Sequence, residues 1–470
     1  MHDFRSFIQL LKDRGEMDHV SREVERTQEL AGVMSKIEAR RRAYYIEHVK
    51  GARFPVVGGL YNKLERFGLA LERDDAETFT HEAFDGCIEA AKASPIEPVT
   101  VTSGPVQENV ITGPAIDLAD LPVPKFFELD SGPFITGAIG ITRDHDSGEL
   151  NIGIYRTLIL GKNTFVINAS SMSDLRRIYA GWEKSGERMP IAMALGVPPA
   201  MLIASSCKLA PNACEYEVAG SLAGEPIKLV KCQDSDLLVP ADAEIVIEGT
   251  VDFSQRVENL LGEFAGQYGP ENAPVTQVNT ITHRNDALYY SIVAGRNPEH
   301  NTLGSVAIFG VRRSIIAAIR AAVPDARDID VLLDPALGTL AHVTISIDKQ
   351  NDARPGEIIE KAFAAGDGIF PVSRITKRII IVDEDIDVHD PIDVNWAIWN
   401  RAATAEKFVV IPNIESWELE RAAKAGQLSV RIGIDATMDL EDVDKLIRPI
   451  IPGVDQIRIE DYIDKQGDLT

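Results

Sequence analysis

The stretch Asn151-Ile-Gly-Ile-Tyr-Arg156 decides how the rest of the chain is interpreted, together with Glu258-Asn-Leu-Leu-Gly-Glu263 far downstream. Residues 152–160 have the composition of a strand. One arginine, two carboxylates and one amide oxygen suit an enzyme that binds a carboxylate and then delivers a proton. Taken alone, the same residues also fit a salt-bridged strand arginine and two solvated surface carboxylates.

Around this stretch, from about residue 98 to about residue 300, short β-branched runs alternate with turns rich in Gly, Pro and Asp. Short strands at such spacing predict a barrel or a sandwich rather than repeated βαβ units. Two helices are predicted to interrupt the strands, near residues 173–184 and 252–260.

The flanking regions show a different pattern of residue types. Residues 3 to about 40 predict two helices, the first capped by Asp3 and the second running through Leu30, Met34 and Ile37. Residues 304–322 form a strongly apolar helical pattern that suits a connector between domains. Strand and helix patterns then alternate to about residue 436, which predicts a smaller α/β domain.

Composition narrows the function classes. The 470-residue chain carries a formal net charge of −24 and shows no basic cluster, which argues against nucleic acid or an anionic membrane as its partner. No apolar signal region or membrane-length apolar run is evident, and the four cysteines show neither a CxxC nor a zinc spacing. We therefore expect a cytoplasmic protein.

Several pieces of sequence, by their order and spacing, resemble the UbiD family of prenylated-flavin-dependent decarboxylases, and they span nearly the whole chain. Besides the two stretches above they include Ile46-Glu-His-Val-Lys-Gly51, residues 117–124, Thr136-Gly-Ala-Ile-Gly-Ile-Thr142, Val230-Lys-Cys232, Gly262-Glu-Phe-Ala-Gly266, Ile381-Val-Asp-Glu-Asp-Ile-Asp387 and Gly433-Ile-Asp-Ala-Thr437.

The resemblance implies a mixed α+β and α/β architecture with five parts. These are an N-terminal helical segment, a split β-barrel flavin-binding domain, a connector helix, a C-terminal α/β oligomerisation domain and a charged tail, over residues 1–95, 96–303, 304–323, 324–458 and 459–470.

The resemblance also implies an activity: reversible, non-oxidative decarboxylation of an aromatic or α,β-unsaturated carboxylic acid. The implied cofactors are prenylated flavin mononucleotide (prenylated FMN) and Mn²⁺ or Mg²⁺, with K⁺ as a further ion that the family allows. Carbon dioxide would be the second product, a prenylated-flavin synthase the cofactor supplier, and a homodimer or homohexamer the assembly.

Three residues match the family's catalytic set. Arg156 would orient the substrate carboxylate, Glu258 would hold Arg156, and Glu263 would protonate the product carbon. The implied pairing is not a consequence of spacing, because residues five apart do not face together on a regular helix.

The implied metal ligands are Asn151 and Glu215, whose oxygens suit Mn²⁺ or Mg²⁺ beside a phosphate. Glu217 would share a strand face with Glu215, so it stays an alternative. The family's third ligand is usually a histidine, but this chain offers Asp174 at that position. Asp174 also fits the N-cap of a helix beginning at Leu175, so both roles remain open.

The resemblance places further residues at the cofactor. The expected contacts beside Arg156 are Thr136, Ile154, Tyr155, Ser205, Ser206 and Cys207. Lys377 is the lysine expected to reach the flavin phosphate, with another lysine or Arg378 as alternatives. His300 and Ile308 are expected near the mouth of the pocket, although a surface loop is the commoner place for such a histidine.

Two rival functions remain at this point. One is an accessory, non-catalytic subunit of a multi-component carboxylase, and the other is a split-barrel flavoprotein that uses plain FMN for redox chemistry. The arginine with two glutamates argues against the first, and the metal-ligand pattern argues against the second. The chain lacks a Walker P-loop, a GxGxxG and a GxSxG motif, which lowers the odds of an ATPase, a nicotinamide dehydrogenase or an α/β-hydrolase.

Overall fold

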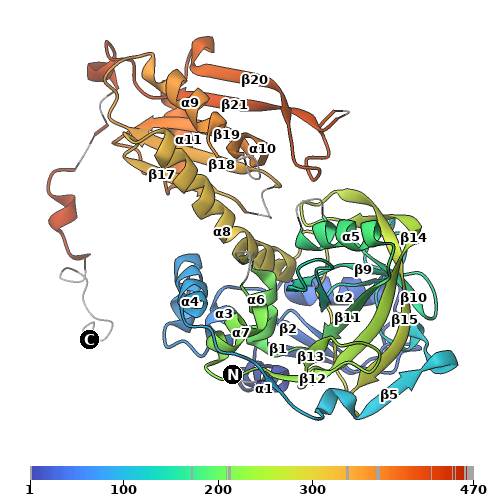
Figure 1. Ribbon diagram of the computed structural model, residues 1–470. Coiled ribbons are helices and arrows are strands. Elements are labelled where there is room, and N and C mark those ends of the chain that lie inside the picture. Colours follow the sequence, from blue (N-terminus) through green and yellow to red (C-terminus); the bar gives the residue numbers. More distant parts are fainter. Residues whose placement is uncertain are drawn as a thin grey trace, which may run out of the picture.

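The structure is a computed structural model that describes residues 3–170, 173–207, 209, 213–334, 338–366, 371–424, 426–446, 448–449, 451–459 and 462. The chain forms a larger lower body and a smaller upper body, joined by the long helix α8 (Figure 1). Apart from residues 459 and 462, the predicted charged tail lies outside the described residues.

The N-terminal part packs into the lower body rather than standing apart. Asp3 caps the first helix by accepting a hydrogen bond from the Ser6 amide at 2.7 Å, as predicted. A four-stranded sheet has the order β1-β2-β3-β16, so a strand from much later in the chain completes it. The elements are α1 Phe4–Asp13, β1 Met17–Val20, α2 Glu29–Glu38, β2 Ala43–Ile46, β3 Val56–Gly58, α3 Glu65–Ala70, α4 His81–Ala93 and β16 Tyr289–Tyr290.

The middle of the chain forms a nine-stranded sheet, in the order β6-β9-β10-β15-β14-β11-β7-β8 with β5 paired to β15. Its strands are β5 Asn109–Thr112, β6 Phe134–Ile135, β7 Ala138–Arg143, β8 Leu150–Ile154, β9 Thr157–Ile159, β10 Thr164–Ile167, β11 Met189–Leu195, β14 Ile245–Gly262 and β15 Tyr268–His283. A smaller sheet orders β13-β12-β4, with β4 Val99–Thr100, β12 Lys228–Lys231 and β13 Leu238–Pro240.

The longest hairpin of this sheet corrects one prediction. Residues 252–260 are not helical but belong to β14, which pairs antiparallel with β15 almost to its end. A register shift between Asp252 and Arg256 breaks the strict alternation of the strand, and such a bulge disturbs the two-residue period that identifies strands in a sequence. The other predicted helix is confirmed as α5 Asp174–Ser185, beside α6 Pro199–Ser206 and α7 Glu215–Ala223.

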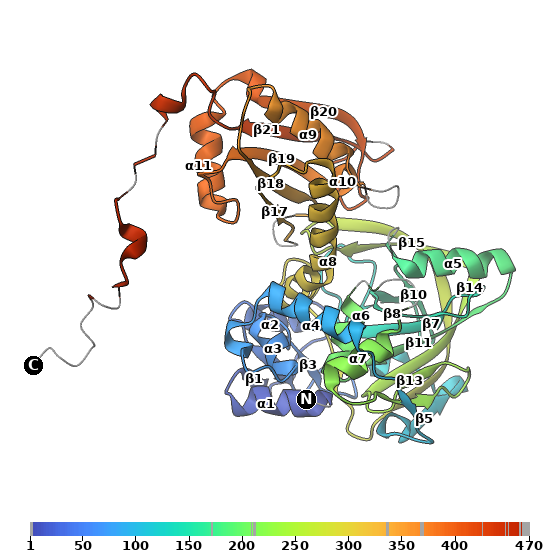
Figure 2. The ribbon, with the colours of Figure 1, turned by 60° about the vertical axis from the view of Figure 1, so that its left-hand side comes forward.

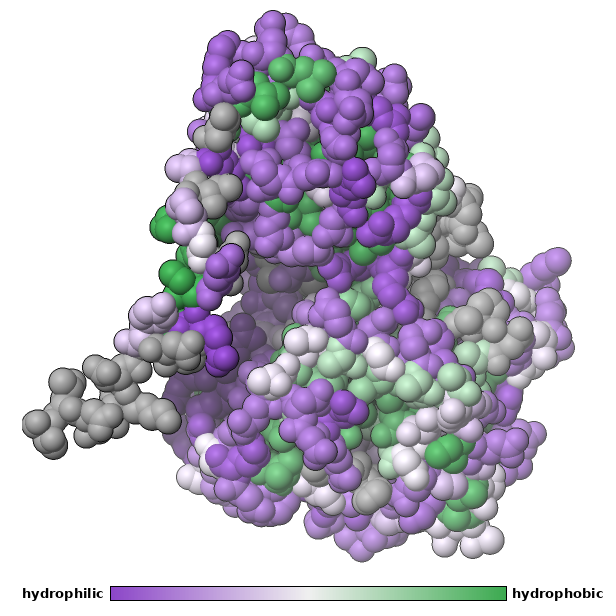
Figure 3. All heavy atoms as spheres, turned by 90° about the vertical axis from the view of Figure 1, so that its left-hand side faces the viewer, coloured by the Kyte–Doolittle hydropathy of each residue, from purple (hydrophilic) through white to green (hydrophobic). Residues whose placement is uncertain are grey.

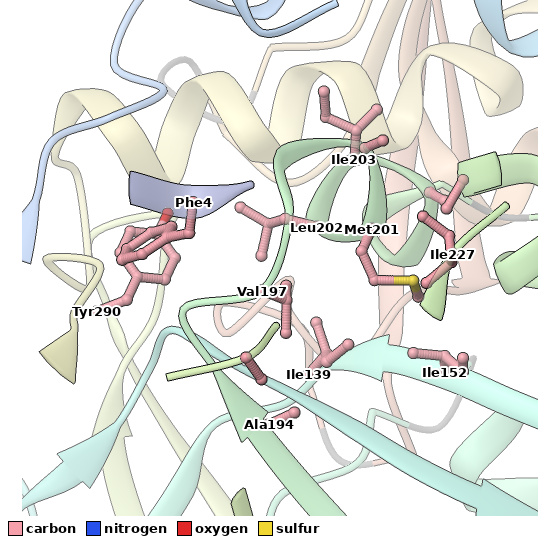
Figure 4. Close-up of a cluster of buried hydrophobic side chains, with 14 of the residues drawn as sticks. Phe4, Ile139, Ile152, Ala194, Val197, Met201, Leu202, Ile203, Ile227 and Tyr290 are labelled. Carbon is pink, nitrogen blue, oxygen red and sulfur yellow. The ribbon is translucent and has the colours of Figure 1, made fainter. Parts of the chain in front are cut away.

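One hydrophobic core joins the N-terminal part to the large sheet. Phe4 of α1 packs edge-on against Tyr290 of β16, with ring centroids 5.7 Å apart. The same buried cluster continues through Ile139 and Ala194 of the sheet to Met201 of α6 (Figure 4). Burial at about 25 cal/mol per Å² of apolar surface is the main force that fixes these elements relative to one another.

The helix α8 Pro298–Ala322 links the two bodies and begins six residues before the predicted connector (Figure 2). By length and composition it is long and apolar enough to cross a membrane, contrary to the expectation that no such segment exists. Here it packs against α4 and α6 of the lower body and against β17 and α9 of the upper one. Leu303 and Val306 belong to the core of the lower body, and Ile315 and Ile319 to the core of the upper one.

The upper body is the predicted α/β unit, with its own core. Its sheet has the order β17-β18-β19-β21-β20, in which β18, β19 and β21 run parallel. The elements are β17 Asp328–Leu332, β18 Ala341–Ile347, α9 Arg354–Ala364, α10 Val372–Ile375, β19 Thr376–Asp383, α11 Pro391–Arg401, β20 Phe408–Glu415 and β21 Leu428–Ala436. The molecular face in Figure 3 is predominantly hydrophilic, with scattered apolar patches.

Candidate active site

A cavity of about 210 Å³ lies where the nine-stranded sheet, α6 and the first turns of α8 meet. Most of its wall is apolar, and the polar groups are few. Its lining comprises Thr136, Ile154, Arg156, Ser205, Ser206, Ile292, Ala294, His300, Leu303, Gly304 and Ala307. Apolar walls with a few convergent polar groups are typical of small-molecule sites.

Arg156 and Glu263 form the charged centre of this site. Arg156 follows β8 and donates a hydrogen bond through Nη1 to Glu263 Oε2. Glu263 follows β14 at the hairpin turn, where its amide donates to the Gln267 carbonyl at 2.7 Å. The Glu263 side chain is only 4% exposed and that of Arg156 22%, so this pair is largely removed from water while the arginine still lines the cavity.

Gly269 of β15 provides the space that Glu263 occupies. A Cβ at this position would lie 2.7 Å from Glu263 Oε1, closer than any real contact allows. The hairpin turn itself contains Gly266 at φ +79°, a conformation that favours glycine. Gly269 therefore leaves room for the buried carboxylate, and Gly266 permits the turn between the two strands.

The expectation that Glu258 holds Arg156 is wrong in this structure. Glu258 is exposed, and its partner across the hairpin is the equally exposed Asn272. Successive side chains of a strand point to opposite faces, so Glu258 points outward while Asn259 is buried. The predicted helix over this segment hid that alternation.

Two residues that sequence reasoning missed lie beside the pair instead. Glu271 of β15 is opposite Asn259, and its Oε2 accepts from Arg176 Nη2 of α5 at 3.1 Å. Burial raises the pKa of the Glu271 carboxyl, whereas Arg176 and Arg156 oppose that rise. The period of two from a correctly assigned hairpin is the signal that would have identified Glu271.

His300 lines the cavity from the first turn of α8 rather than lying in a surface loop. Its Nδ1 lies 3.2 Å from the Gly295 carbonyl, and its ring meets that of Phe264 edge-on with centroids 6.2 Å apart. Burial and the nearby Arg156 lower the pKa of His300 to about 4. The imidazole is therefore neutral at physiological pH. Ile308 lies on the same helix but outside the lining, next to Ala307.

Two of the predicted metal ligands, Asn151 and Glu215, come from adjoining segments, because the Ile152 amide beside Asn151 donates to Glu215. Asn151 of β8 is buried and donates through Nδ2 to the Tyr155 hydroxyl at 2.9 Å. Glu215, the first residue of α7, accepts a long hydrogen bond from the Ile152 amide through Oε1, while its buried Oε2 has no partner among the described residues. Burial raises the pKa of Glu215 to about 7, and the charge of Asp174 adds to this.

Asp174 is not the N-cap of α5, because Ser173 takes that place and Asp174 is the exposed first helical residue. Glu217 lies in a helix rather than in a strand, so it does not share a face with Glu215, and that alternative is excluded. No group of three or more His, Cys, Asp or Glu side chains suited to a metal occurs among the described residues. A cation would therefore have to use the Asn151 amide together with carboxylates, and the unpaired Glu215 oxygen fits that chemistry.

The expected cofactor residues divide into two groups. Thr136, Ile154, Ser205 and Ser206 line the cavity with Arg156. Tyr155 is buried behind it, with its ring close to Gly140 and Gly153. Cys207 ends α6 outside the lining, and burial raises the pKa of its thiol to about 12.

Lys377 does not reach this cavity, which corrects the expectation that it binds the cofactor phosphate. It lies on β19 in the upper body, where Nζ donates to Glu420 Oε1 at 2.5 Å and to Ser429 Oγ at 3.1 Å. Arg378, its alternative, is likewise on β19, and burial lowers its pKa.

The upper body approaches the site through the loop that follows β20. Trp417 packs against Phe264 at the hairpin turn, with ring centroids 6.4 Å apart. Ser170 Oγ donates to Glu418 Oε1 at 2.9 Å across the same boundary. Residues next to Glu263 are thus in contact with both bodies.

Comparison with known proteins assigns the chain to a family. Three sequence profiles for 3-octaprenyl-4-hydroxybenzoate carboxy-lyase match the chain: the N-terminal domain over residues 8–83, the Rift-related domain over 98–297 and the C-terminal domain over 306–436. An uncharacterised protein of Archaeoglobus fulgidus is 32% identical over 464 residues, which cover 94% of this chain and 92% of the relative.

Solved structures give the same picture. The UbiD-class enzyme HmfF from Pelotomaculum thermopropionicum in complex with FMN superposes with a TM-score of 0.80 at 30% identity, covering 98% of this chain and all of HmfF. An evolved dimeric form of HmfF in complex with prenylated FMN gives 0.76 at 30% identity, with the same coverage. Vanillic acid decarboxylase from Sedimentibacter hydroxybenzoicus, at 24% identity, covers 98% of each chain with a TM-score of 0.79 and shows the shared fold. With family profiles on all three parts of the chain and full-length relatives at 30% identity or more, this protein belongs to the UbiD family of carboxy-lyases.

Proposed function

We propose that this enzyme catalyses the non-oxidative, reversible decarboxylation of an aromatic or α,β-unsaturated carboxylic acid. The observation that carries the proposal is the Arg156–Glu263 pair at the wall of an apolar cavity. The pair places a cation that can bind the substrate carboxylate next to a carboxyl group that can donate a proton.

Arg156 is the substrate-binding cation in this proposal. Its guanidinium lines the cavity and has N–H groups beyond the one given to Glu263, so it is able to hold a substrate carboxylate with paired hydrogen bonds. Ile154, Ile292 and Leu303 form apolar walls that suit an aromatic or unsaturated body. Such walls also exclude water from the ion pair, which strengthens its electrostatic interactions.

Glu263 is the proton donor in this proposal. Its carboxyl group is buried beside the substrate-binding cation, and in its protonated form it would deliver a proton to the carbon that loses carbon dioxide. The neutral His300 adds a polar group to the same cavity without adding charge.

The proposed cofactor is prenylated FMN, held in the cavity by Thr136, Ile154, Ser205 and Ser206, within a middle domain that we interpret as a split β-barrel. When bound, it would supply the electron sink that accepts the electrons of the breaking carbon–carboxylate bond. The proposed cation, Mn²⁺ or Mg²⁺ with K⁺ as a further ion, would use Asn151, Glu215 and Asp174. The unpaired Glu215 oxygen supports this assignment.

The assembly is a separate part of the proposal. Ile392, Trp399 and Val410 of the upper body are 80%, 84% and 61% exposed, and exposed large apolar side chains commonly mark interfaces. They support a homodimer or homohexamer formed through the C-terminal domain. A prenylated-flavin synthase would supply the cofactor in the cytoplasm. The accessory-subunit and plain-FMN redox alternatives are not favoured, because neither needs a buried arginine–carboxylate pair at the cavity.

Glu263→Gln tests the proposal. Gln keeps the volume and a hydrogen bond to Arg156 but has no acidic proton, and loss of a positioned proton donor lowers kcat by roughly 10²–10⁴-fold. Turnover is measured on protein co-expressed with a prenylated-flavin synthase, and bound cofactor is quantified in both proteins. Turnover near that of the unmodified enzyme, with equal cofactor content, would remove Glu263 from this role.

A further inference from the structure

Glu271 is a second carboxyl group on the same side of the hairpin as Glu263. The Glu263 side chain lies against Gly269, and Gly269 and Glu271 are two residues apart on β15. Positions two apart on a strand share a face and lie about 7 Å from each other. The two carboxyl groups therefore lie on one face of the hairpin, close enough for the charge of Glu263 to raise the pKa of Glu271.

The two carboxyl groups differ in their access to solvent. The side chain of Glu263 is 4% exposed, whereas that of Glu271 is 16% exposed. Glu271 is held by Arg176, whose side chain is 37% exposed. Of the two carboxyl groups, Glu271 is therefore the one with more access to solvent, and the partly exposed Arg176 holds it.

The charged groups around Glu271 come from four parts of the chain and have opposing effects on its pKa. Burial raises the pKa of Glu271, Arg176 of α5 and Arg156 after β8 lower it, and Glu263 of the hairpin and Glu418 of the upper body raise it. The net effect is a pKa above the ordinary value of a glutamate, which favours the protonated form that a proton-supplying group needs.

Each decarboxylation leaves Glu263 without its proton, and this proton has to be replaced. We propose that Glu271 supplies it, a role that rests on the proposed function of Glu263. The O–H bond of the Glu271 carboxyl breaks and a new O–H bond forms on the Glu263 carboxylate, directly or through one water. The Glu271 carboxylate, held by Arg176, then takes a proton from solvent, so the charge of the site returns to its starting value.

The resemblance to known relatives placed the second carboxylate at Glu258, whereas the hairpin register places it at Glu271. Glu258 and Asn272 face outward together, and Asn259 and Glu271 face inward together. Glu271 acts through Glu263 and is a positioning and proton-supplying residue rather than one that meets the substrate.

The experiment compares Glu271→Gln, Glu258→Gln and Glu263→Gln, each loaded with cofactor, with Glu149→Gln at an exposed turn as a matched control. We expect kcat of Glu271→Gln to fall about tenfold near pH 8 and to approach the unmodified enzyme near pH 6, where solvent protons are more abundant. Added formate should restore the rate at the higher pH, because a small acid replaces the missing group. Glu271→Asp should retain most of the activity.

A loss in Glu271→Gln that is equal at every pH and insensitive to formate would indicate a structural role and overturn the proposal. So would a pH profile unchanged in Glu271→Gln but altered in Glu258→Gln. The proposed function would fail by a different result: Glu263→Gln would keep its activity, independently of the kinetics of Glu271→Gln.

Discussion

Arg156–Glu263 in the lower body and Lys377–Glu420 in the upper body are both pairs of a basic residue and a glutamate. The two pairs differ in their surroundings. Arg156 donates one hydrogen bond to Glu263, and its guanidinium opens onto a cavity. Lys377 binds Glu420 and Ser429, and Glu420 also binds Arg431 and Ser416, so that network is closed on itself. A buried charged pair indicates a catalytic site only where hydrogen-bonding capacity remains directed at a cavity.

The largest effect should come from Arg156→Lys. Lysine keeps the charge but lacks the planar fork that binds a carboxylate with two hydrogen bonds, so kcat/KM should fall by about 10²–10³-fold. Steady-state kinetics on enzyme saturated with cofactor measure this change in kcat/KM. Arg177→Lys, at an exposed position on α5, is the matched control. An unchanged kcat/KM would show that Arg156 is as structural as Lys377.

Gly269→Ala should have an intermediate effect on the same pair. The added methyl group would meet Glu263 Oε1, and the side chain would have to move by a few tenths of an ångström or more. A misplacement of about 1 Å costs up to about 10²-fold in rate, so we expect roughly a tenfold loss of kcat. Gly86→Ala on α4, where nothing lies within 4 Å of an added Cβ, controls for a general effect of alanine. Equal kinetics in both variants would mean that the position of Glu263 is not critical.

Lys377→Met should change stability rather than chemistry. Leaving the mostly buried Glu420 with one cation fewer should lower the free energy of unfolding by about 1–2 kcal/mol, with kcat changed less than about twofold. Urea denaturation and steady-state kinetics separate the two. A large loss of kcat with normal stability would restore Lys377 as a residue of the site.

The stabilisation that Lys377 gives through Glu420 should depend on pH in one direction. Burial alone would raise the pKa of Glu420, but hydrogen bonds from Lys377, Ser416 and Ser429 outweigh it and lower the pKa below its ordinary value. The stabilisation is therefore complete above the ordinary pKa of a glutamate, about 4.3, and is lost as the pH falls through the lowered value. The stability difference between Lys377→Met and the unmodified enzyme should be largest at neutral pH and shrink in acid.

Much of the fold followed from the sequence, because amphipathic periods and cap residues are local. Asp3 as a helix cap, the helix after Ser173 and the alternating upper body were all visible in this way. The residues at the cavity wall, including Arg156, Ser205 and Ser206, followed from resemblance to the family.

The errors share a physical cause: they concern contacts set by register and by tertiary packing. Glu258 was assigned to the site by resemblance to the family, and the sequence does not reveal that its side chain points outward. Lys377 was wrongly assigned to the cofactor phosphate because the sequence does not reveal that its side chain packs against β21. Glu271 was missed for the opposite reason, since only the hairpin pairing brings it beside the site.

The most direct test of the account is the identity of the bound cofactor. The protein is co-expressed with a prenylated-flavin synthase, the cofactor is released, and its mass and absorption spectrum are recorded with a metal analysis. We expect prenylated FMN together with manganese or magnesium. Plain FMN without metal, or no flavin at all, would contradict it.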